Sequence, residues 1–312
     1  MDTEYPGTLL AFEARFATEG ACRDYLMHLR WPEGFVCPRC GGVKLWRATR
    51  GRLMCGDCRY TTTVTAGTIF QDTHQPLRVW FRAIWQVTSQ KTGANALGLQ
   101  RVLGQGSYVT AWTMLHKLRR AMVRPGRDRL RGRVEVDEIY IGGQEVGREG
   151  RTAQTKALVA VAAEEDGEGI GRIRLARIPN VKKDSCHRFV AWAVERGSVV
   201  HTDGWTGYLG LDTQGYFHEV TPLDGRPKTT ATEAMPRVHR VSALLKRWLL
   251  GTHQGAVRAN QLDYYLDEFT FRFNRRTSRS RGKLFCRLLQ QAVQVDPAPY
   301  KRIVGGNPTP KI

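Results

Sequence analysis

The sequence predicts a mixed α/β domain in the second half of the chain, preceded by a cysteine-rich segment and a helical segment of the helix-turn-helix type. Three observations support this arrangement. Two Cys-x-x-Cys pairs lie near the N-terminus, three helical stretches follow them, and strand-like runs and helices make up most of the rest. With 312 residues, the chain has room for two or three domains, one of them large enough to bury a sizeable core.

The first segment, residues 1–70, begins with a short predicted helix. Apolar side chains recur at helical spacing across residues 18–31, and Pro32 ends this stretch. Four cysteines then follow at the spacing of metal ligands: Cys37, Cys40, Cys55 and Cys58. Two short turns that each present two thiolates can complete a tetrahedron around Zn²⁺, so these residues predict a zinc ribbon with a structural ion.

Other roles for the cysteines fit less well. Disulfides are disfavoured in a reducing compartment, and a redox-active Cys-x-x-Cys motif does not need a second copy. The remaining cysteines have no partner at ligand spacing and are expected to be small buried hydrophobic residues: Cys22, Cys186 and Cys286.

The second segment, residues 71–125, has a helix-turn-helix-like layout. Its predicted helices are separated by Gly-containing breaks and cover residues 76–89, 94–103 and 107–123. In the last helix, apolar residues repeat every three positions and leave the other faces to polar side chains. An ordinary amphipathic helix would explain this pattern equally well, but the ribbon before it and a basic linker after it favour a DNA-reading helix. We assign DNA contacts to Thr113, His116, Lys117 and Arg120.

The charge of the chain also indicates a polyanionic partner. Lys and Arg number 48 against 29 Asp and Glu, which gives a net charge of +19. A merely basic protein is the alternative, but the charges are clustered. Eight of the twenty residues 114–133 are basic, and a second cluster spans residues 272–283. From these two basic arms we assign phosphate contacts to Arg127, Arg129, Arg131, Arg275 and Arg276.

Residues 126–295 predict the α/β domain. Three consecutive strands, expected to be antiparallel, are followed by a helix, a short strand at residues 198–202 and two more helices at residues 236–250 and 261–274. Residues 296–312 are rich in Pro and Gly and predict a flexible tail.

No segment suggests export or membrane insertion. The N-terminal residues lack a basic region and an apolar region, and no apolar stretch approaches the roughly 18 residues that a membrane-spanning helix needs. We therefore expect a cytoplasmic protein without membrane contact.

Two carboxylates stand at the ends of predicted strands. Asp137 ends the run Val-Glu-Val-Asp, where strand alternation puts it on the same face as Glu135 and Ile139, and Asp203 follows the short strand. Each alone fits a locally hydrogen-bonded turn or strand-end residue. As a pair on neighbouring strands, they can hold two Mg²⁺ ions about 4 Å apart at a phosphodiester.

With these motifs together, the sequence resembles the ISXO-like insertion-sequence transposases of the insertion sequence 1595 family, which are zinc-ribbon members of the DDE class. Beside the cysteines, the resemblance is carried by residues 63–70, 134–138, 201–205, 238–241, 245–248, 251–253 and 271–276. It covers nearly the whole chain. It implies an RNase-H-like catalytic domain, cut-and-join chemistry at the ends of a DNA element, and divalent metal ions.

The resemblance also directs attention to a third metal ligand. In the DDE class an acid commonly lies about 35 residues after the second Asp, with a Lys or Arg seven residues later. The corresponding positions here are His239 and Lys246, which lie two helical turns apart on one face. Histidine replaces the usual glutamate, so Asn274 and Glu268 remain alternatives for this ligand.

The resulting hypothesis is a transposase. Residues 18–125 would bind terminal inverted repeats, and residues 130–295 would catalyse strand cleavage and strand transfer with Mg²⁺ or Mn²⁺, using water and then a 3′-hydroxyl as nucleophile. Double-stranded DNA is the expected partner, with a homodimer or higher assembly formed on DNA in the bacterial nucleoid. The alternatives are a non-enzymatic zinc-ribbon DNA-binding protein derived from a degenerate transposase, and an RNase-H-like nuclease acting on RNA or on a junction.

Overall fold

The protein is described by a computed structural model that covers residues 5–124, 126–142, 156–221, 231–255 and 257–306. It forms two compact units, which are described separately. Unit 1 comprises Met1–Pro125 with Ser278–Ile303, and unit 2 comprises Gly126–Thr277 with Val304–Ile312. Within the described residues, no helix has both the length and the hydropathy of a membrane span.

Unit 1 contains a helical core built around stacked aromatic rings. Its helices are α1 (Leu9–Arg15), α2 (Glu19–Arg30), α3 (Leu77–Ser89), α4 (Ala96–Leu103), α5 (Tyr108–Ala121) and α10 (Arg281–Ala292). The ring of Phe285 on α10 lies 5.2 to 5.9 Å from the rings of Phe12, Phe81 and Trp85. α10 therefore packs in unit 1, although the sequence placed residues up to 295 with the α/β domain.

Capping residues define the helices of unit 1. Asn95 begins α4 by accepting the N–H of Gly98 at 2.7 Å, and Gly104 ends it with a φ of +61°. The carboxylate of Glu19 accepts the N–H groups of Leu77 and Arg78 at the start of α3. The predicted pair of helices with a Gly-containing break is thus present as α4 and α5.

The ribbon of unit 1 is a three-stranded antiparallel sheet in the order β1-β2-β3. Its strands are β1 (Leu45–Arg47), β2 (Leu53–Cys55) and β3 (Thr61–Thr62), and the 3₁₀ turn η1 (Thr49–Gly51) joins the first two. The small core beneath this sheet consists of Phe35, Cys37, Leu53 and Cys55. Two of its four members are cysteines, so the ribbon depends on what the cysteines bind.

Unit 2 contains a five-stranded mixed sheet in the order β6-β5-β4-β7-β8. The strands are β4 (Arg133–Ile141), β5 (Ala157–Asp166), β6 (Gly169–Arg177), β7 (Val199–Thr202) and β8 (Phe217–Val220). β4, β5 and β6 are antiparallel neighbours, while β7 is parallel to β4 and β8 is parallel to β7. The predicted mixed α/β class and the three consecutive antiparallel strands are confirmed.

β8 was not predicted from the sequence. Its four residues are exposed or half-buried, so they lack the apolar alternation that identifies a strand.

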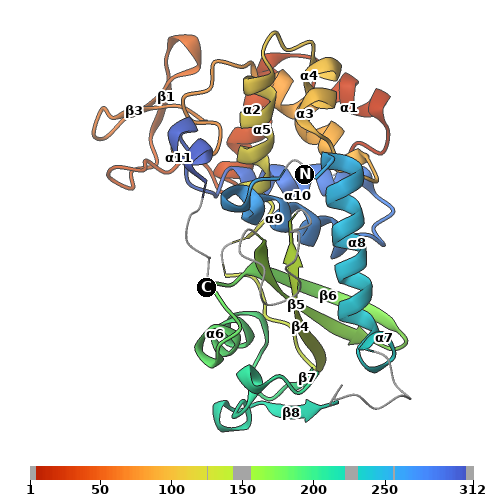
Figure 1. Ribbon diagram of the computed structural model, residues 1–312. Helices are drawn as coiled ribbons and strands as arrows, with labels where there is room; N and C mark the ends of the chain where they lie inside the picture. Colours follow the sequence, from red (N-terminus) through yellow and green to blue (C-terminus); the bar gives the residue numbers. More distant parts are fainter. Residues whose placement is uncertain (1–4, 125, 143–155, 222–230, 256, 307–312) are drawn as a thin grey trace. The chain divides into compact units, whose positions relative to one another are not determined.

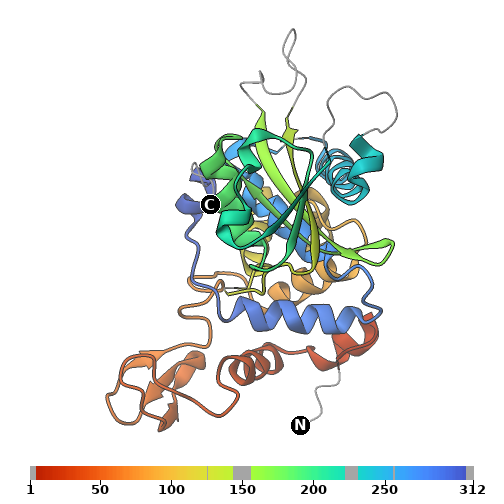
Figure 2. The same cartoon turned by 90° about the horizontal axis from the view of Figure 1, so that it is seen from below.

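Helices cover both faces of this sheet (Figures 1 and 2). On one face, α6 (Lys183–Ala193) packs on Val134, Val136 and Val200. On the other face, α8 (Pro236–His253) and α9 (Leu262–Phe273) pack on a core that includes Ile139 and Val159. The remaining elements of unit 2 are α7 (Ala231–Ala234), η3 (Thr206–Tyr208), η4 (Asp212–Gln214) and η5 (Ala259–Gln261).

The C-terminal segment is more structured than expected. α11 (Tyr300–Gly305) is a short helix, and its Ile303 is fully buried. The flexible tail predicted from residue 296 therefore does not describe the segment through residue 306, because an apolar side chain anchors it. Residues 307–312 lie outside the described residues.

Candidate functional site

The four ribbon cysteines come together as predicted. Cys37 Sγ lies 3.7 Å from Cys58 Sγ, Cys40 Sγ lies 3.6 Å from Cys55 Sγ, and all four sulfurs lie within 4.8 Å of one another. Zinc–sulfur bonds of about 2.3 Å in a tetrahedron place the sulfurs about 3.8 Å apart, so this cluster fits Zn²⁺. The ribbon is a structural zinc site.

Two thiols of this cluster differ in their tendency to ionise. Although burial opposes ionisation of Cys37, the backbone N–H groups of Cys40 and Arg39 and the neighbouring thiols lower its pKa to about 7. For Cys40, the N–H of Gly42 favours the thiolate, but the other cysteines outweigh it and raise the pKa to about 12. The thiolate of Cys37 therefore forms readily, whereas that of Cys40 is favoured by a bound positive charge.

Asp137 lies on the face of the sheet that α8 covers. Val134 and Val136 belong to the core under α6, whereas Ile139 belongs to the core under α8 and α9. Strand alternation therefore places Asp137 on the same face of the sheet as Ile139, as the sequence indicated. Its Oδ1 accepts the N–H of Glu138 at 2.7 Å.

Glu135 lies two residues before Asp137 on β4 and fixes the start of α8. Its Oε2 accepts the N–H groups of Arg237 and Val238 at 2.8 and 2.9 Å, and its Oε1 accepts Arg237 Nη1 at 3.0 Å. A carboxylate in this position satisfies N–H groups that a helix leaves unpaired and interacts favourably with the helix dipole. The first turn of α8, which carries His239, is thereby held beside Asp137.

His239 faces Asp137 with an unused nitrogen. His239 Nε2 lies 3.9 Å from Asp137 Oδ2, beyond hydrogen-bond distance, and this buried atom has no hydrogen-bond partner in the described part of the chain. Two ligand atoms that are each about 2.1 Å from one ion lie at most about 4.2 Å apart. A separation of 3.9 Å is therefore compatible with both atoms binding one divalent ion.

Asp203 follows β7, which runs parallel to β4. The register pairs Val134 with Val200 and Glu135 with His201, and its continuation by two residues reaches Asp137 and Asp203. Asp203 Oδ1 accepts the N–H of Trp205 at 3.0 Å. Asp203 is the first residue after β7, two residues past the last pair of this register, whereas Asp137 is not at a strand end as predicted but in the middle of β4 (Arg133–Ile141).

The carboxylates and His239 do not form a closed cage. In the described residues, the four-cysteine cluster is the one group of three or more ligating side chains with mutually close ligand atoms. A common metal site for Asp137, Asp203 and His239 therefore requires side-chain adjustment.

The two alternative third ligands have other partners. Asn274 Oδ1 accepts the N–H of Ile173 at 2.7 Å, and its Nδ2 donates to the carbonyl of the same residue at 3.2 Å. Glu268 is fully buried in α9 and accepts Arg272 Nε at 2.8 Å. His239 is thus the candidate whose unused ligand atom faces Asp137, and Lys246 lies exposed two turns farther along α8.

One predicted DNA contact on α5 needs correction. His116 is fully buried, its Nδ1 lies 3.0 Å from Arg119 Nη1, and its ring stacks on Trp112 at 4.0 Å. The apolar repeat predicted the wrong buried face for α5. The buried face includes Met114, Leu115 and His116, while Val109 is exposed.

The other three α5 positions are half-buried. Thr113 Oγ1 donates to the carbonyl of Val109 at 2.7 Å, and Lys117 Nζ donates to the carbonyl of Gln71 at 3.4 Å. Burial lowers the pKa of Lys117, against the influence of Asp72. Arg120 lies near the end of the same helix. The exposed part of α5 is its N-terminal turn, with Tyr108 and Val109.

The arginines of the first basic arm differ in their exposure to solvent. Arg129 and Arg131 are exposed, whereas Arg127 is half-buried with its guanidinium 4.8 Å from the ring centroid of Trp192. Burial lowers the pKa of Arg127, and nearby Asp267 opposes this shift. Arg129 and Arg131 therefore remain the better candidates for phosphate contacts.

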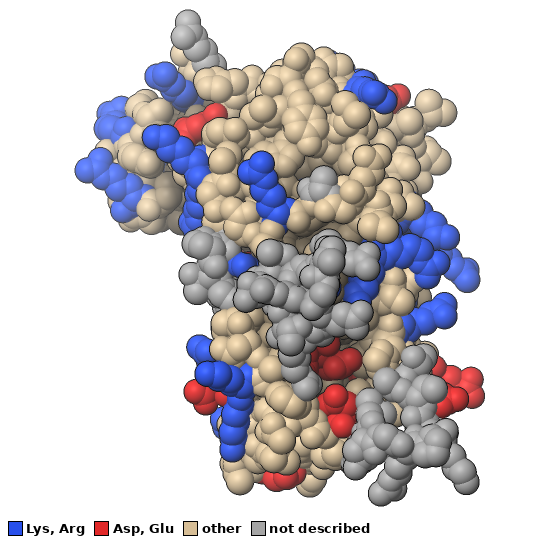
Figure 3. Space-filling model, viewed as in Figure 1, with Lys and Arg blue, Asp and Glu red and all other residues tan. Residues whose placement is uncertain are grey.

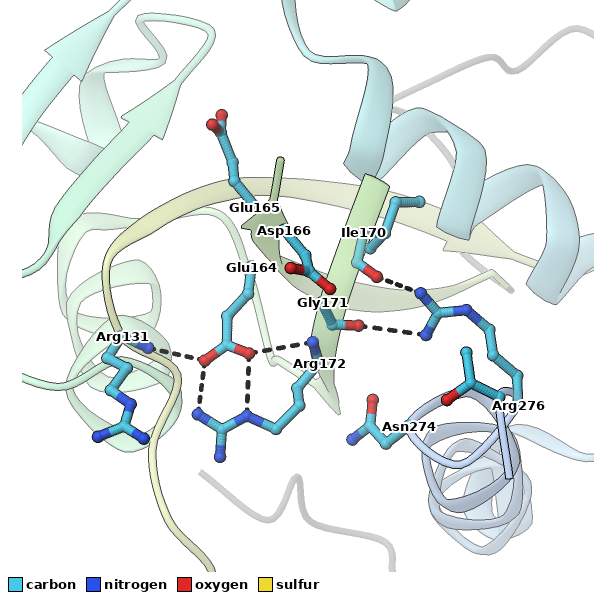
Figure 4. Close-up of a pocket in the computed structure, with 10 residues that line it drawn as sticks. Arg131, Glu164, Glu165, Asp166, Ile170, Gly171, Arg172, Asn274 and Arg276 are labelled. Atoms are coloured by element: carbon cyan, nitrogen blue, oxygen red, sulfur yellow. Dashed lines mark hydrogen bonds and ion pairs between the residues drawn. The ribbon is translucent and has the colours of Figure 1, made fainter. Parts of the chain in front are cut away.

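The two arginines assigned from the second basic arm, Arg275 and Arg276, make contacts within unit 2. Arg276 donates to the carbonyls of Ile170, Gly171 and Phe273 and stacks on the ring of Phe273 at 4.1 Å, and Arg275 stacks on Phe271. Figure 4 shows Arg276 and Asn274 beside β6, in a polar pocket of 450 Å³. Both side chains thus satisfy backbone groups of an edge strand, which argues against a free DNA-contacting role for Arg276.

Sequence reasoning missed Glu135 as a residue that shapes the site. The available signal was an acid two positions before Asp137, on the same strand face. A buried acid at this point needs a partner, but the identity of that partner, the N-terminus of α8, follows only from the tertiary structure.

Comparisons with known proteins agree with this description. The model of the ISXO2-like transposase domain matches residues 129–274, and that of the transposase zinc-ribbon domain matches residues 17–61. A protein in the transposable element ISH50 of Halobacterium salinarum is 26% identical over 287 residues, which cover 86% of this chain and 94% of that protein. No solved structure matches. By these matches, the chain carries a transposase zinc-ribbon domain followed by an ISXO2-like transposase domain.

Proposed function

We propose that this transposase binds the terminal inverted repeats of its element and catalyses DNA strand cleavage and strand transfer at a site formed by Asp137, Asp203 and His239. The observation that carries the proposal is the approach of His239 Nε2 to within 3.9 Å of Asp137 Oδ2, with no hydrogen-bond partner for that nitrogen in the described part of the chain. A buried, unsatisfied imidazole nitrogen is costly unless a ligand uses it.

The sheet topology supports an RNase-H-like catalytic domain. β4 lies in the centre of the order β6-β5-β4-β7-β8, with the antiparallel strands on one side and the parallel strands on the other. This order puts the first and fourth strands of the sheet side by side, which supports a joint role for Asp137 on β4 and Asp203, the first residue after β7.

Each residue has a separate task. The carboxylates of Asp137 and Asp203 and the imidazole of His239 would hold Mg²⁺ or Mn²⁺. Such ions, when bound, would activate the attacking water or 3′-hydroxyl and stabilise the leaving oxygen. Lys246, exposed two turns after His239, would position a phosphate of the DNA end. No covalent intermediate with the protein is required.

DNA would be held by both units. In unit 1, the turn between α4 and α5 and the exposed N-terminal turn of α5 form a helix-turn-helix-like reader, and Thr113, Lys117 and Arg120 lie farther along that helix. In unit 2, Arg129 and Arg131 would contact phosphates without regard to sequence. His116 has no part in this interface because it is buried.

Strand cleavage of a duplex that carries the element's end tests the proposal. The wild-type protein should nick this duplex only when Mg²⁺ or Mn²⁺ is added. Asp137→Asn and Asp203→Asn should each lower the rate by at least about a hundredfold while leaving the folded structure intact. Asp184→Asn is a matched control, because Asp184 is exposed on α6 at the other face of the sheet.

Three results would count against the proposal. If the wild-type protein binds the duplex but never nicks it, the chain acts as a DNA-binding protein without catalysis. Preferred cleavage of RNA or of a junction would identify a different nuclease. Equal loss of activity in the Asp184→Asn control would mean that the carboxylate assignment is wrong.

A further inference from the structure

The two knuckles of the zinc ribbon share one backbone conformation. In the first knuckle, Gly41 N donates to Cys37 O at 2.9 Å, and in the second, Arg59 N donates to Cys55 O at 3.1 Å. The residue after the second cysteine has a φ of +75° at Gly41 and +60° at Arg59. The two positions are equivalent, but one holds glycine and the other holds arginine.

Arginine is a costly residue at such a position. A positive φ brings Cβ close to the backbone in any residue other than glycine, so the second knuckle is less stable than it would be with glycine. Strain of this kind persists where the side chain has a use that outweighs it. The side chain of Arg59 must therefore be considered for a role outside the zinc site.

The side chain of Arg59 lies on an exposed aromatic ring. Its guanidinium carbon is 4.2 Å from the ring centroid of Trp46, and Trp46 is 45% exposed. Within β1, Leu45 packs on the ribbon core, so strand alternation turns Trp46 to the outer face of the sheet. Stacking on the ring fixes the orientation of the guanidinium and leaves its N–H groups at the rim available for the oxygen atoms of an anion.

A second, looser pair lies on the same ribbon. The guanidinium carbon of Arg39 is 6.0 Å from the ring centroid of Tyr60, which is 37% exposed. Neither Arg39 nor Arg59 has an ion pair with a carboxylate in the described part of the chain. Both knuckles thus present an exposed guanidinium supported by an aromatic ring.

The ribbon has the charge that a polyanion requires. Residues 34–62 contain six Lys or Arg and one Asp, and a zinc tetrathiolate would add two negative charges, which leaves a net charge of about +3. Figure 3 shows Lys and Arg side chains gathered over the part of unit 1 that Figure 1 labels β1 and β3. This surface favours anionic partners over apolar or basic ones.

We propose that Arg59, held on Trp46, and Arg39, beside Tyr60, clamp the phosphate backbone of double-stranded DNA on the outer face of the ribbon. The proposal deepens the proposed function, on which it rests for the identity of the polyanion. It assigns the ribbon a direct DNA contact in addition to its structural zinc. The contact is with the backbone, so it gives affinity without sequence preference.

Replacement of Arg59 by glycine tests the proposal, because glycine is the residue that the backbone prefers at this position. Arg59→Gly in the full chain should keep one zinc per ribbon and resist a chelator at least as well as wild type. Its affinity for two short DNA duplexes of unrelated sequence should fall about five- to tenfold for both at 0.1 M salt, and the salt slope of binding should decrease by about one. Arg59→Asn, which also tolerates a positive φ, is the second variant.

Arg47→Gln provides the matched control. Arg47 lies on the same ribbon and is 69% exposed, but it is ion-paired with Asp24 at 3.4 Å and alternates with Trp46 on β1. Its replacement should change affinity by less than twofold. Trp46→Leu should lower affinity in the same direction as Arg59→Gly, since it removes the support of the guanidinium.

Binding is measured without added Mg²⁺ or Mn²⁺, so its result does not depend on strand cleavage. Wild-type affinity in a zinc-loaded Arg59→Gly or Arg59→Asn protein would overturn the proposal, whether or not the protein cleaves DNA. A loss confined to one duplex sequence, or an equal loss in Arg47→Gln, would overturn it as well. Equal loss on both duplexes with zinc retained and the control unaffected would establish it.

Discussion

The histidine at position 239 determines which divalent ion the proposed metal site is expected to prefer. Mg²⁺ prefers oxygen ligands, whereas imidazole suits Mn²⁺ and later divalent ions better. Since His239 Nε2 faces Asp137 Oδ2 at 3.9 Å, a site that uses it should work relatively better with Mn²⁺ than a site with three carboxylates.

His239→Glu should therefore retain cleavage and shift the preference toward Mg²⁺, while His239→Ala should lower the cleavage rate by about a hundredfold or more with either ion. The measurement is the ratio of nicking rates in Mg²⁺ and Mn²⁺ for each variant. Unchanged ratios and rates in both variants would remove His239 from the metal site.

Asn274 illustrates the opposite case, a residue whose motif suggested chemistry and whose contacts indicate structure. Its side-chain amide accepts a hydrogen bond from the N–H of Ile173 and donates one to the carbonyl of Ile173, as a neighbouring strand would do. Asn274→Ala should lower the free energy of unfolding by about 2 kcal/mol, because two backbone groups lose their partner. Denaturant unfolding measures this loss.

Cleavage per folded Asn274→Ala molecule should remain within about threefold of wild type. A stable but inactive variant would show that Asn274, and not His239, is the third ligand. The sequence could not decide between them, since side-chain contacts across about a hundred residues leave no local pattern. His116 shows the same limit, because a period of three residues left its burial undetermined.

At the scale of elements, α8 connects a buried acid with the candidate active site. Glu135 is 1% exposed and receives two backbone N–H groups and Arg237 Nη1 at the start of the helix. His239 is two residues beyond Arg237, so the position of its imidazole depends on how this turn is anchored. Glu135 thus acts as a positioning residue for the site.

Glu135→Ala should cost about 3 kcal/mol of unfolding free energy, since it leaves Arg237 and the helix start without their partner. Glu135→Gln still accepts the backbone N–H groups and should cost less. In the variants that remain folded, cleavage should fall in the order wild type, Gln, Ala, and excess Mn²⁺ should partly restore it. Full activity in a destabilised Glu135→Ala protein would contradict the positioning role.

The sequence predicted well those elements whose pattern repeats over several turns or residues. The three antiparallel strands and the pair α4 and α5 were found because their apolar periods and Gly-containing breaks are local. β8 was missed because it is a strand only through its backbone pairing with β7, and neither of its faces is buried. The register that relates Asp203 to Asp137 likewise depends on pairing, which the sequence does not specify.

At the scale of the whole molecule, the sequence indicated the first boundary at which the chain passes between the units and missed the second. The break near residue 126 was indicated by the Pro-Gly pair in the sequence at 125–126, which disfavours a continued helix. The return of Ser278–Ile303 to unit 1 had no such signal. α10 has apolar residues at helical spacing that would suit any core, and only the complementary aromatic rings of Phe12, Phe81 and Trp85 determine where Phe285 packs.

This division makes the effect of zinc removal a test of the architecture. The ribbon core consists of Phe35, Leu53 and two of the cysteines, too few apolar side chains to offset the entropy of ordering the segment. Zinc binding in such sites supplies about 10 kcal/mol or more of folding free energy. A chelator should therefore unfold residues 34–62, and Cys55→Ser should have the same effect without a chelator.

Hydrogen exchange measured by mass spectrometry on the full chain distinguishes this local effect from a general one. Amides of β1, β2 and both knuckles should exchange fast after chelation, because their hydrogen bonds depend on the four sulfurs being held together. Amides of β4, β5 and β6 should keep their protection, since the cores on both faces of that sheet contain no ribbon residue. If β4 lost protection together with the ribbon, the two units would fold as one, and DNA binding and catalysis could not be separated by zinc. If neither changed, the four cysteines would not hold the ion that keeps the ribbon folded.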